Sequence, residues 1–334
     1  MLLALFSFFG AFMGNEYIRN EKYYYSFPDY CKKTFGRKLY RIALDINSTC
    51  PNRDGSIGEG GCIFCSNAGS GDFSINYIDI LERGNSLDIN TVPYLAKTSG
   101  NHGDYIAYFQ SYTNTYGDIK KLSKIYEAAM EDPLFTGLSI GTRPDCVGDE
   151  VLKMLKDLRK KYPNKFIWVE LGLQTIHEET ARFIRRGYSL NIFDESVDKL
   201  HELGIQVISH VIIGLKGESE EMIYETINHL NQMKVDGVKL QLLHYLKDTD
   251  LGKMLLDKRK LGELSLMPLD KNSYISILIG CIGRLLPDIV IHRLTGDGDR
   301  ERLIEPIWSL NKKNILNEIR REMKKRGIVQ GSLL

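Results

Sequence analysis

The sequence is short of cysteine, which excludes a disulfide-stapled scaffold. Six cysteines occur in 334 residues, three of them within residues 48–69 and the others scattered at Cys31, Cys146 and Cys281. Disulfide-rich domains are small, secreted and much denser in cysteine. The cluster of three predicts metal chemistry in a reducing compartment, and we interpret the scattered three as inert buried thiols.

A membrane-spanning run and an excess of charge of one sign are also missing. The first 14 residues are apolar, but roughly 20 are needed to span a bilayer. They also lack the basic start and the cleavage site of a signal peptide. We interpret them as part of an N-terminal extension over residues 1–34 and predict a cytoplasmic protein without a membrane partner. The net charge is only +1, so composition alone does not indicate a nucleic-acid binder.

Linkers, low-complexity tracts and repeats of a fixed period are absent too, so nothing divides the chain clearly into two domains. With 43% apolar and 26% charged residues, the chain is typical of a globular protein large enough for one α/β barrel. We therefore expect a main domain over residues 35–250. A C-terminal region over residues 251–334 would complete the side of the barrel and carry a basic helix.

Short apolar runs alternate with amphipathic segments along most of the chain. The runs cover residues 39–47, 104–112, 136–144, 166–175, 206–214 and 237–245, with a seventh at 288–297. Most are apolar on both faces, as parallel strands covered by helices must be. Helical patterns lie at residues 118–130, 218–233 and 271–286. Alternating β and α units predict a parallel sheet with right-handed crossovers, and six units favour a partial barrel over an open doubly wound sheet.

Polar residues follow the predicted strands at the end where such folds place their active sites. They are residues 110–113, 141–143, 170–174 and 210–214, with His244, His292 and Arg293. The loop that holds Cys50, Cys62 and Cys65 follows the first predicted strand. We therefore expect all of these residues to meet at one mouth of the barrel.

Three clustered cysteines are compatible with two kinds of metal site. A structural zinc ion would need a fourth ligand, from Cys31, Cys146 or a distant histidine. A four-iron cluster held by only three thiolates leaves one iron open to bind another molecule. The cysteine count leaves both possibilities open, and the position at a barrel mouth favours iron.

The cysteine loop, "CPNRDGSIGEGGCIFC", has the spacing Cys-x11-Cys-x2-Cys and resembles the cluster loop of the elongator-like YhcC/YtqA-type radical SAM proteins. The resemblance continues in order through "AYFQSYTNTY", "IGTRPDC", "ELGLQTIHEETARFIRRGY", "HVIIGLKGE", "GVKLQLLH" and "RGIVQGS". It implies an α/β fold, the radical SAM partial (β/α)6 TIM barrel, with a C-terminal extension. It also implies a [4Fe-4S] cluster on Cys50, Cys62 and Cys65, S-adenosyl-L-methionine on the fourth iron, and a reducing electron donor such as flavodoxin or ferredoxin.

The resemblance also implies residues that bind S-adenosyl-L-methionine. Gln110 and Ser111 occupy the position of a Gly-Gly-Glu-like stretch that binds the methionine amino group. Gln174 and Arg186 have the spacing of the glutamine and arginine that hold the nucleoside and the carboxylate in coproporphyrinogen-type and elongator-type enzymes. Arg186 could instead be an exposed helix residue.

Two more strand ends are assigned to the cofactor in the same way. Some relatives carry a glutamate where this chain has Gly141, and Glu170 is the predicted replacement, unless it pairs with a neighbouring arginine. The segment from His210 to Gly214 resembles the motif whose backbone lies against adenine, with Gly214 close to the base.

For the substrate, the resemblance favours tRNA. YtqA-type proteins have been linked to conversion of the carboxymethylaminomethyl group of wobble uridine to aminomethyl. We predict that Arg143 pairs with the substrate carboxylate and that His244 and Arg293 contact phosphate or base, although each could be an ordinary ion-pair partner. Residues 311–326 hold seven Lys or Arg against two Glu, which is typical of a solvated helix face and also suits a phosphate backbone. The alternatives are a radical SAM enzyme acting on a protein or small molecule, and a zinc-stabilised RNA-binding protein without catalysis.

Overall fold

The structure is a computed structural model of the chain, and it describes residues 23–67, 69, 74–84, 87–88, 104–263, 266–296 and 298–334. Most of the predicted N-terminal extension lies outside these residues. None of the helices in the described ranges has the length and apolar character needed to cross a membrane.

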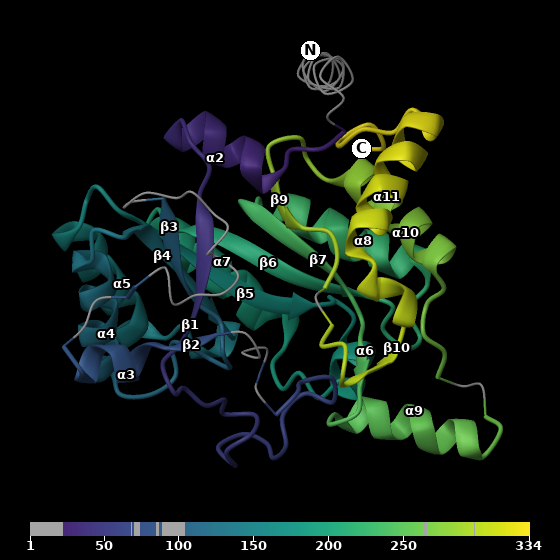
Figure 1. Cartoon of the computed structure of the whole chain (residues 1–334), viewed down its shortest axis with the longest axis horizontal. Helices are drawn as coiled ribbons and strands as arrows, with labels where there is room; N and C mark the ends of the chain where they lie inside the picture. Colours follow the sequence, from purple (N-terminus) through teal and green to yellow (C-terminus); the bar gives the residue numbers. More distant parts are fainter. Residues whose placement is uncertain are drawn as a thin grey trace.

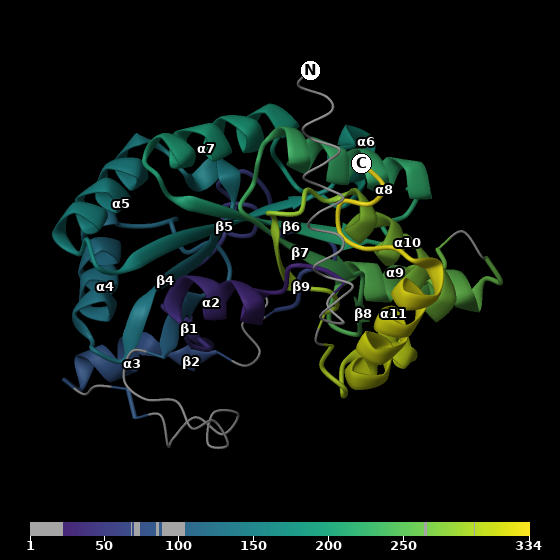
Figure 2. The same cartoon turned by 90° about the horizontal axis from the view of Figure 1, so that it is seen from above.

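A parallel sheet forms the centre of the molecule and curves into a partial barrel (Figures 1 and 2). Its strands are β1 (Tyr40–Asp45), β2 (Ile75–Asn76), β3 (Tyr105–Phe109), β4 (Phe135–Thr142), β5 (Phe166–Gln174), β6 (Gln206–Ile213), β7 (Gly237–Leu242) and β9 (Val290–Arg293). Their order across the sheet is β2-β1-β3-β4-β5-β6-β7-β9. The seven apolar runs that predicted strands are all strands, and the fold class is confirmed.

Helices follow most of the strands, and several of them cover the outer face of the sheet. They are α2 (Phe27–Phe35), α3 (Tyr77–Glu82), α4 (Ile119–Glu131), α5 (Asp149–Lys161), α6 (Glu178–Phe183), α7 (Leu190–Glu202), α8 (Glu220–Gln232), α9 (Asp250–Lys260), α10 (Lys271–Arg284) and α11 (Lys312–Arg326). In Figure 2 helices α4, α5, α7 and α8 lie along the outside of the curved sheet. Side-chain oxygens of Asp118, Ser219 and Asp270 accept from backbone N–H groups in the first turns of α4, α8 and α10, and so stabilise their starts.

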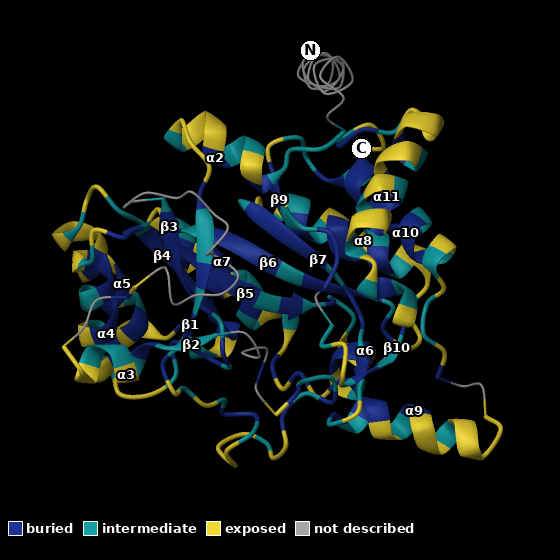
Figure 3. Cartoon of the chain, in the orientation of Figure 1, coloured by how far each residue is buried: buried dark blue, intermediate teal, exposed yellow. Residues whose placement is uncertain are grey.

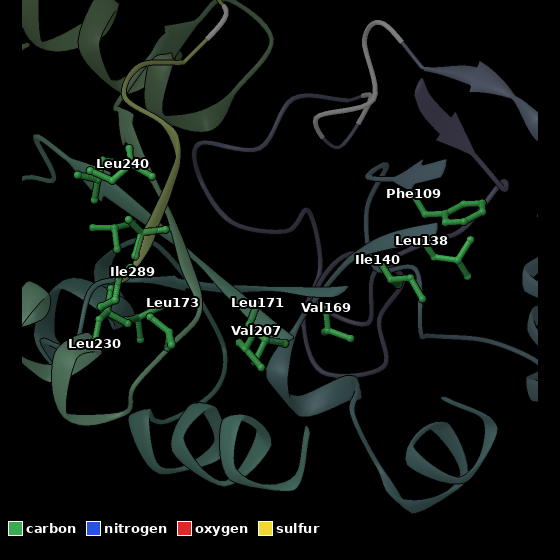
Figure 4. Close-up of a cluster of buried hydrophobic side chains, with 14 of the residues drawn as sticks. Phe109, Leu138, Ile140, Val169, Leu171, Leu173, Val207, Leu230, Leu240 and Ile289 are labelled. Atoms are coloured by element: carbon green, nitrogen blue, oxygen red, sulfur yellow. The ribbon is translucent and has the colours of Figure 1, made fainter. Parts of the chain in front are cut away.

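The main hydrophobic core lies between the sheet and these helices. Figure 4 shows Leu138, Val169 and Val207 from neighbouring strands among its side chains. Figure 3 shows the strands largely buried, while the helices are exposed along one side. This division into a buried and an exposed side is what the 3.6-residue period of the helical segments predicts.

Helix α2 closes the amino end of the barrel, although residues 1–34 were expected to be an appended extension. Phe27 and Cys31 are buried against Trp168 of β5, and the backbone N–H of Ile291 in β9 donates to the carbonyl of Tyr25 at 2.8 Å. The described part of this segment therefore belongs to the barrel and fills the end opposite the cysteine loop.

The C-terminal region packs beside β7 and β9. A short antiparallel pair, β8 (Tyr245–Leu246) and β10 (Leu303–Glu305), lies outside the main sheet. Helix α11 buries Ile315, Ile319 and Met323 against the core. Its basic face is solvated, as one of the two interpretations of residues 311–326 requires.

Candidate active site

A cavity of about 330 Å³ lies at the carboxyl ends of the strands. The thiols of the cysteine loop line one part of it. Most residues that were predicted for the site line it as well: Cys50, Cys62, Cys65, Gln110, Arg143, Glu170, Gln174, Arg186, His210, His244 and Arg293. A volume of this size is within the usual range of ligand-binding cavities. The strand ends and the cysteine loop therefore meet at one mouth.

The cysteine loop is folded by its own backbone and anchored to neighbouring elements. Backbone N–H groups of Arg53 and Asp54 donate to the carbonyl of Cys50, and that of Cys65 donates to the carbonyl of Cys62 at 3.0 Å. Ile63 links the loop to α6 and α9. Its N–H donates to the carbonyl of Ile184, directly after α6, and its carbonyl accepts from the N–H of Leu251 in α9. The thiols are thus held in place by turns rather than by regular secondary structure.

The surroundings of Cys62 favour its ionised form. A hydrogen bond from Cys65, together with the positive charge of Arg143 and a hydrogen bond from Asn52, lowers the pKa of the Cys62 thiol to about 7 although burial acts the other way. The side-chain amide of Asn52 donates to Cys62 Sγ at 3.5 Å and to the carbonyl of Arg185. The hydrogen bond from Cys65 to Cys62 also raises the pKa of Cys65, so in the absence of metal Cys62 is the thiolate of this pair and Cys65 its donor.

The arrangement of the three thiols on the cavity wall suits a metal cluster better than a single metal ion. Among the residues that the structure describes, no group of three His, Cys, Asp or Glu side chains converges tightly enough to hold a single metal ion. Cys50, Cys62 and Cys65 instead line the wall of a space much larger than one ion. This donor set would suit an iron–sulfur cluster held by three thiolates.

Arg143 has partners other than the predicted substrate carboxylate. Its Nε and Nη2 donate to the two carboxylate oxygens of Asp145 at 2.9 and 2.7 Å, and its Nη1 donates to the carbonyl of Arg186. The guanidinium also lies over the ring of Tyr188, 4.9 Å from the ring centroid. Asp145 therefore occupies the bidentate edge of Arg143, and the remaining contacts join the end of β4 to the segment from Arg186 to Tyr188.

Arg186 likewise differs from the cofactor ligand predicted for it, and it is not an exposed helix residue either. The side chain is buried, and all five of its N–H donors have protein acceptors. These acceptors are the carbonyl oxygens of Leu173, Thr175 and Tyr188, the last accepting twice, and a carboxylate oxygen of Glu178. Arg186 therefore fixes the backbone after β5, and no donor is left for a cofactor carboxylate.

Glu170 is the centre of a buried polar network. Its Oε2 accepts from Lys239 Nζ and from His210 Nε2, the latter at 2.7 Å, and its Oε1 accepts from Ser139 Oγ at 2.7 Å. Although burial acts to raise it, the charge of Lys239 and the hydrogen bond from His210 hold the pKa of the Glu170 carboxyl well below its ordinary value. Burial lowers the pKa of His210, which is therefore neutral, with Nδ1 accepting from Gln241 Nε2 at 3.4 Å.

Two predicted cofactor residues do not line the cavity. Ser111 is buried beside it, where its hydroxyl bonds to Ser74 Oγ at 3.0 Å. Gly214 has a positive φ of 97° and packs against Leu269 and Leu243. Gln110 and Gln174 do line the cavity, so of the two adjacent polar residues after β3 it is Gln110 that lies on the cavity wall.

Several residues of the site were not predicted from the sequence, although for two of them the sequence contained a signal. Lys239 is the one charged residue in β7, and Arg41 lies among apolar residues in β1 before that strand's final Asp45. A single charge in a strand that is covered on both faces must point into the barrel. Tyr108 and Tyr188 gave no such signal, because tyrosine is common in buried strands and turns.

Comparison with known proteins matches both parts of the chain to family models. The Radical SAM superfamily model matches residues 44–230, and the Radical_SAM C-terminal domain model matches residues 235–325. YtqA of Bacillus subtilis is 39% identical over 315 residues, which cover 94% of each chain. YhcC of Escherichia coli is 32% identical over 302 residues, which cover 90% of this chain and 92% of YhcC.

Two further proteins are less similar to this chain. A tRNA uridine(34) acetyltransferase of Methanocaldococcus jannaschii is 30% identical over 140 residues, covering 41% of this chain and 24% of that protein. The solved structure of Elp3 from Methanocaldococcus infernus superposes with a TM-score of 0.62 at 17% identity, covering 88% of this chain and 65% of Elp3. At that identity the superposition shows a shared fold.

Proposed function

Because this chain belongs to the radical SAM superfamily, and within it to the YhcC/YtqA type, we propose that it modifies the wobble uridine of tRNA. The reaction that we propose converts a carboxymethylaminomethyl group on that base to aminomethyl. Loss of a hydrogen atom from the carbon beside the carboxylate, and of one electron that the oxidised cluster would accept, would give an imine, which water would hydrolyse to the amine and glyoxylate. Proteins of this superfamily use a [4Fe-4S] cluster and S-adenosyl-L-methionine, and these are the cofactors of this chain.

In this proposal the cysteine loop holds the cluster through Cys50, Cys62 and Cys65. When bound, the cluster and S-adenosyl-L-methionine supply a 5′-deoxyadenosyl radical, which removes a hydrogen atom from the substrate. Gln110 and Gln174, whose side chains lie on the cavity wall, contact S-adenosyl-L-methionine. The protein otherwise contributes position and a partly enclosed cavity, and an electron donor such as flavodoxin or ferredoxin reduces the cluster.

The observation that carries the substrate proposal is the similarity to a tRNA uridine(34) acetyltransferase over 140 residues. That protein is named for action on the same nucleoside of tRNA, and Elp3 supports the same architecture. His244 and Arg293 line the cavity and are the side chains that we assign to the nucleotide. Arg143, whose guanidinium is paired with Asp145, joins the end of β4 to the segment from Arg186 to Tyr188 in this scheme.

Nucleoside mass spectrometry of tRNA from cells with and without the protein tests this proposal. Cells without it are expected to accumulate the carboxymethylaminomethyl uridine and to lose the aminomethyl form. A copy carrying Cys62→Ala should leave the cells in the same state as the deletion, because the cluster is needed. Unchanged nucleosides would contradict the tRNA proposal and would direct the search to a protein or a small molecule as substrate.

The position of the basic groups predicts which of them contact tRNA. Gln330, just after α11, donates to the carbonyls of Leu286 and Ile289, which precede β9. The last turn of α11 therefore lies at the amino end of the sheet, away from the cysteine loop (Figure 1). Lys216 instead lies 5.2 Å from the ring centroid of Phe183, which packs in one cluster with Ile63 of the cysteine loop.

Replacing Lys216 and the exposed Arg182 by alanine is expected to weaken tRNA binding and to flatten its dependence on salt, because each phosphate contact releases counterions. The log–log salt slope should fall by up to about 2 for the two charges. Replacing Lys324 and Lys325 in α11 removes the same charge at the other end and serves as the matched control. Equilibrium binding of tRNA over a range of salt concentrations measures both, and a larger loss in the α11 variant would contradict this placement.

A further inference from the structure

The floor of the cavity is built from charged and polar side chains, with each of the central strands contributing one. Tyr108 from β3, Glu170 from β5, His210 from β6 and Lys239 from β7 line the cavity, and Arg41 from β1 and Ser139 from β4 complete the network around Glu170 without lining it. The interior of a barrel of this kind is ordinarily filled by branched apolar side chains. Burying an ion costs several kcal/mol, so apolar packing would be the simpler way to fill this space. The network therefore suggests a ligand.

Positive charge outweighs negative charge on this floor. Glu170 is the carboxylate of the network, and the described groups that act most strongly on Lys239 besides it are the guanidinium groups of Arg41 and Arg293. Burial lowers the pKa of His210 and of His292, so both imidazoles are neutral. One carboxylate is thus shared among several cations, and an anionic ligand would improve the balance.

Two residues of this network have N–H groups without an acceptor among the described residues. An ammonium group has three N–H donors, and Lys239 Nζ has two acceptors in the described structure, Tyr108 Oη at 2.9 Å and Glu170 Oε2. The Nε of Arg41 is buried and has no hydrogen-bond acceptor among the described residues, since Glu170 Oε1 is 4.0 Å away. Lys239 and Tyr108 also line the cavity that holds Cys50, Cys62 and Cys65.

We propose that Lys239, positioned by Glu170 and Tyr108, forms a subsite that binds the carboxylate of the substrate. Lys239 thus takes the role that the sequence predicted for Arg143, namely to bind the substrate carboxylate. A carboxylate held there would orient the adjoining CH₂ group within the same cavity as the cysteine thiols, and so place its hydrogen for removal. The inference rests on the proposed function for the identity of the carboxylate-bearing group.

Equilibrium dialysis with 5-carboxymethylaminomethyluridine and its uncharged carboxamide tests the subsite. The anaerobic holoenzyme is expected to bind the acid about 10- to 100-fold more tightly than the amide, as a charge-assisted hydrogen bond would give. Lys239→Met should bind both nucleosides alike. Lys165→Met is the matched control, because that half-buried lysine donates to the carbonyl of Asp132 away from the cavity.

A second variant keeps the test valid if Lys239→Met does not fold. Glu170→Gln combined with Lys239→Met removes both charges of this pair together, so neither member is left without the other, and it too should lose the preference for the acid. An unchanged preference in a folded Lys239 variant, or no preference in the wild-type protein, overturns the subsite. The mass spectrometry of cellular tRNA decides the proposed function separately, because it does not depend on which side chain holds the carboxylate.

Discussion

Replacing Cys62 with alanine is expected to abolish cluster binding and the cleavage of S-adenosyl-L-methionine together. Two remaining thiols cannot hold a four-iron cluster that already has only three protein ligands. Cys62 is also the thiol whose surroundings most favour the thiolate, since Cys65, Arg143 and Asn52 lower its pKa to about 7. Iron and sulfide analysis after anaerobic reconstitution, with measurement of 5′-deoxyadenosine and methionine, gives the readout.

Cys146→Ala and Cys281→Ala are the matched controls for this experiment. Cys146 is half-buried next to Asp145, and burial raises the pKa of its thiol to about 12. Cys281 is buried within α10. Both variants should retain a full complement of iron and sulfide. A cluster that persists in Cys62→Ala would sink the ligand assignment, and a colourless protein with one bound zinc ion would favour the zinc-stabilised RNA-binding alternative.

The strands and the convergence of their ends could be predicted because they follow from local patterns. An apolar run such as 206–214 needs burial on both faces, and only a covered parallel sheet offers this to consecutive runs. Once the strands are parallel, their carboxyl ends must share one edge, which brings Cys50 and Gln174 to the same cavity. No knowledge of individual side-chain contacts is needed for either step.

The roles of Arg143 and Arg186 could not be predicted in the same way, because they depend on acceptors brought close only by the fold. The acceptors of Arg186 are mostly backbone carbonyls of the segment after β5, and backbone carbonyls carry no sequence signal. Asp145 is adjacent in sequence to the predicted substrate clamp, but only the turn over Pro144–Cys146 shows that its carboxylate faces Arg143. The position of a residue at a strand end therefore predicts that it belongs to the site, but it does not predict whether its N–H donors are already bound by other protein groups.

The network around Glu170 is formed by ionisable residues whose common role could not be recognised from the sequence. Several apolar runs hold an ionisable residue among apolar ones, Arg41, Glu170, His210 and Lys239 among them, and the pattern becomes meaningful when the strands lie side by side. His210 and Lys239 are register partners in β6 and β7, so their side chains emerge at the same level of the barrel. Glu170 reaches both from β5.

Replacing Glu170 with glutamine is expected to destabilise the protein in a way that depends on pH. Burial already lowers the pKa of Lys239 to about 7, and the Glu170 carboxylate is what opposes that effect. Without the carboxylate the pKa of Lys239 in the folded state falls further, while in the unfolded state it keeps its ordinary value near 10.4. The folded variant then binds fewer protons than the unfolded chain below pH 7 as well as above it.

The loss of stability in Glu170→Gln should therefore grow as the pH falls below about 7, by up to about 1.4 kcal/mol per pH unit, whereas Lys239 contributes no such slope in the wild-type protein at that pH. Urea unfolding of the full-length protein at several pH values measures this. Combining Glu170→Gln with Lys239→Met removes the group that loses its proton, so the double variant should return to the wild-type slope. It should also be more stable at low pH than Glu170→Gln alone, because the methionine at position 239 is buried without having to release a proton. If Glu170→Gln unfolds at the wild-type urea concentration at low pH, Lys239 does not depend on Glu170 for its charge, and the cation on the cavity floor must be stabilised by another group.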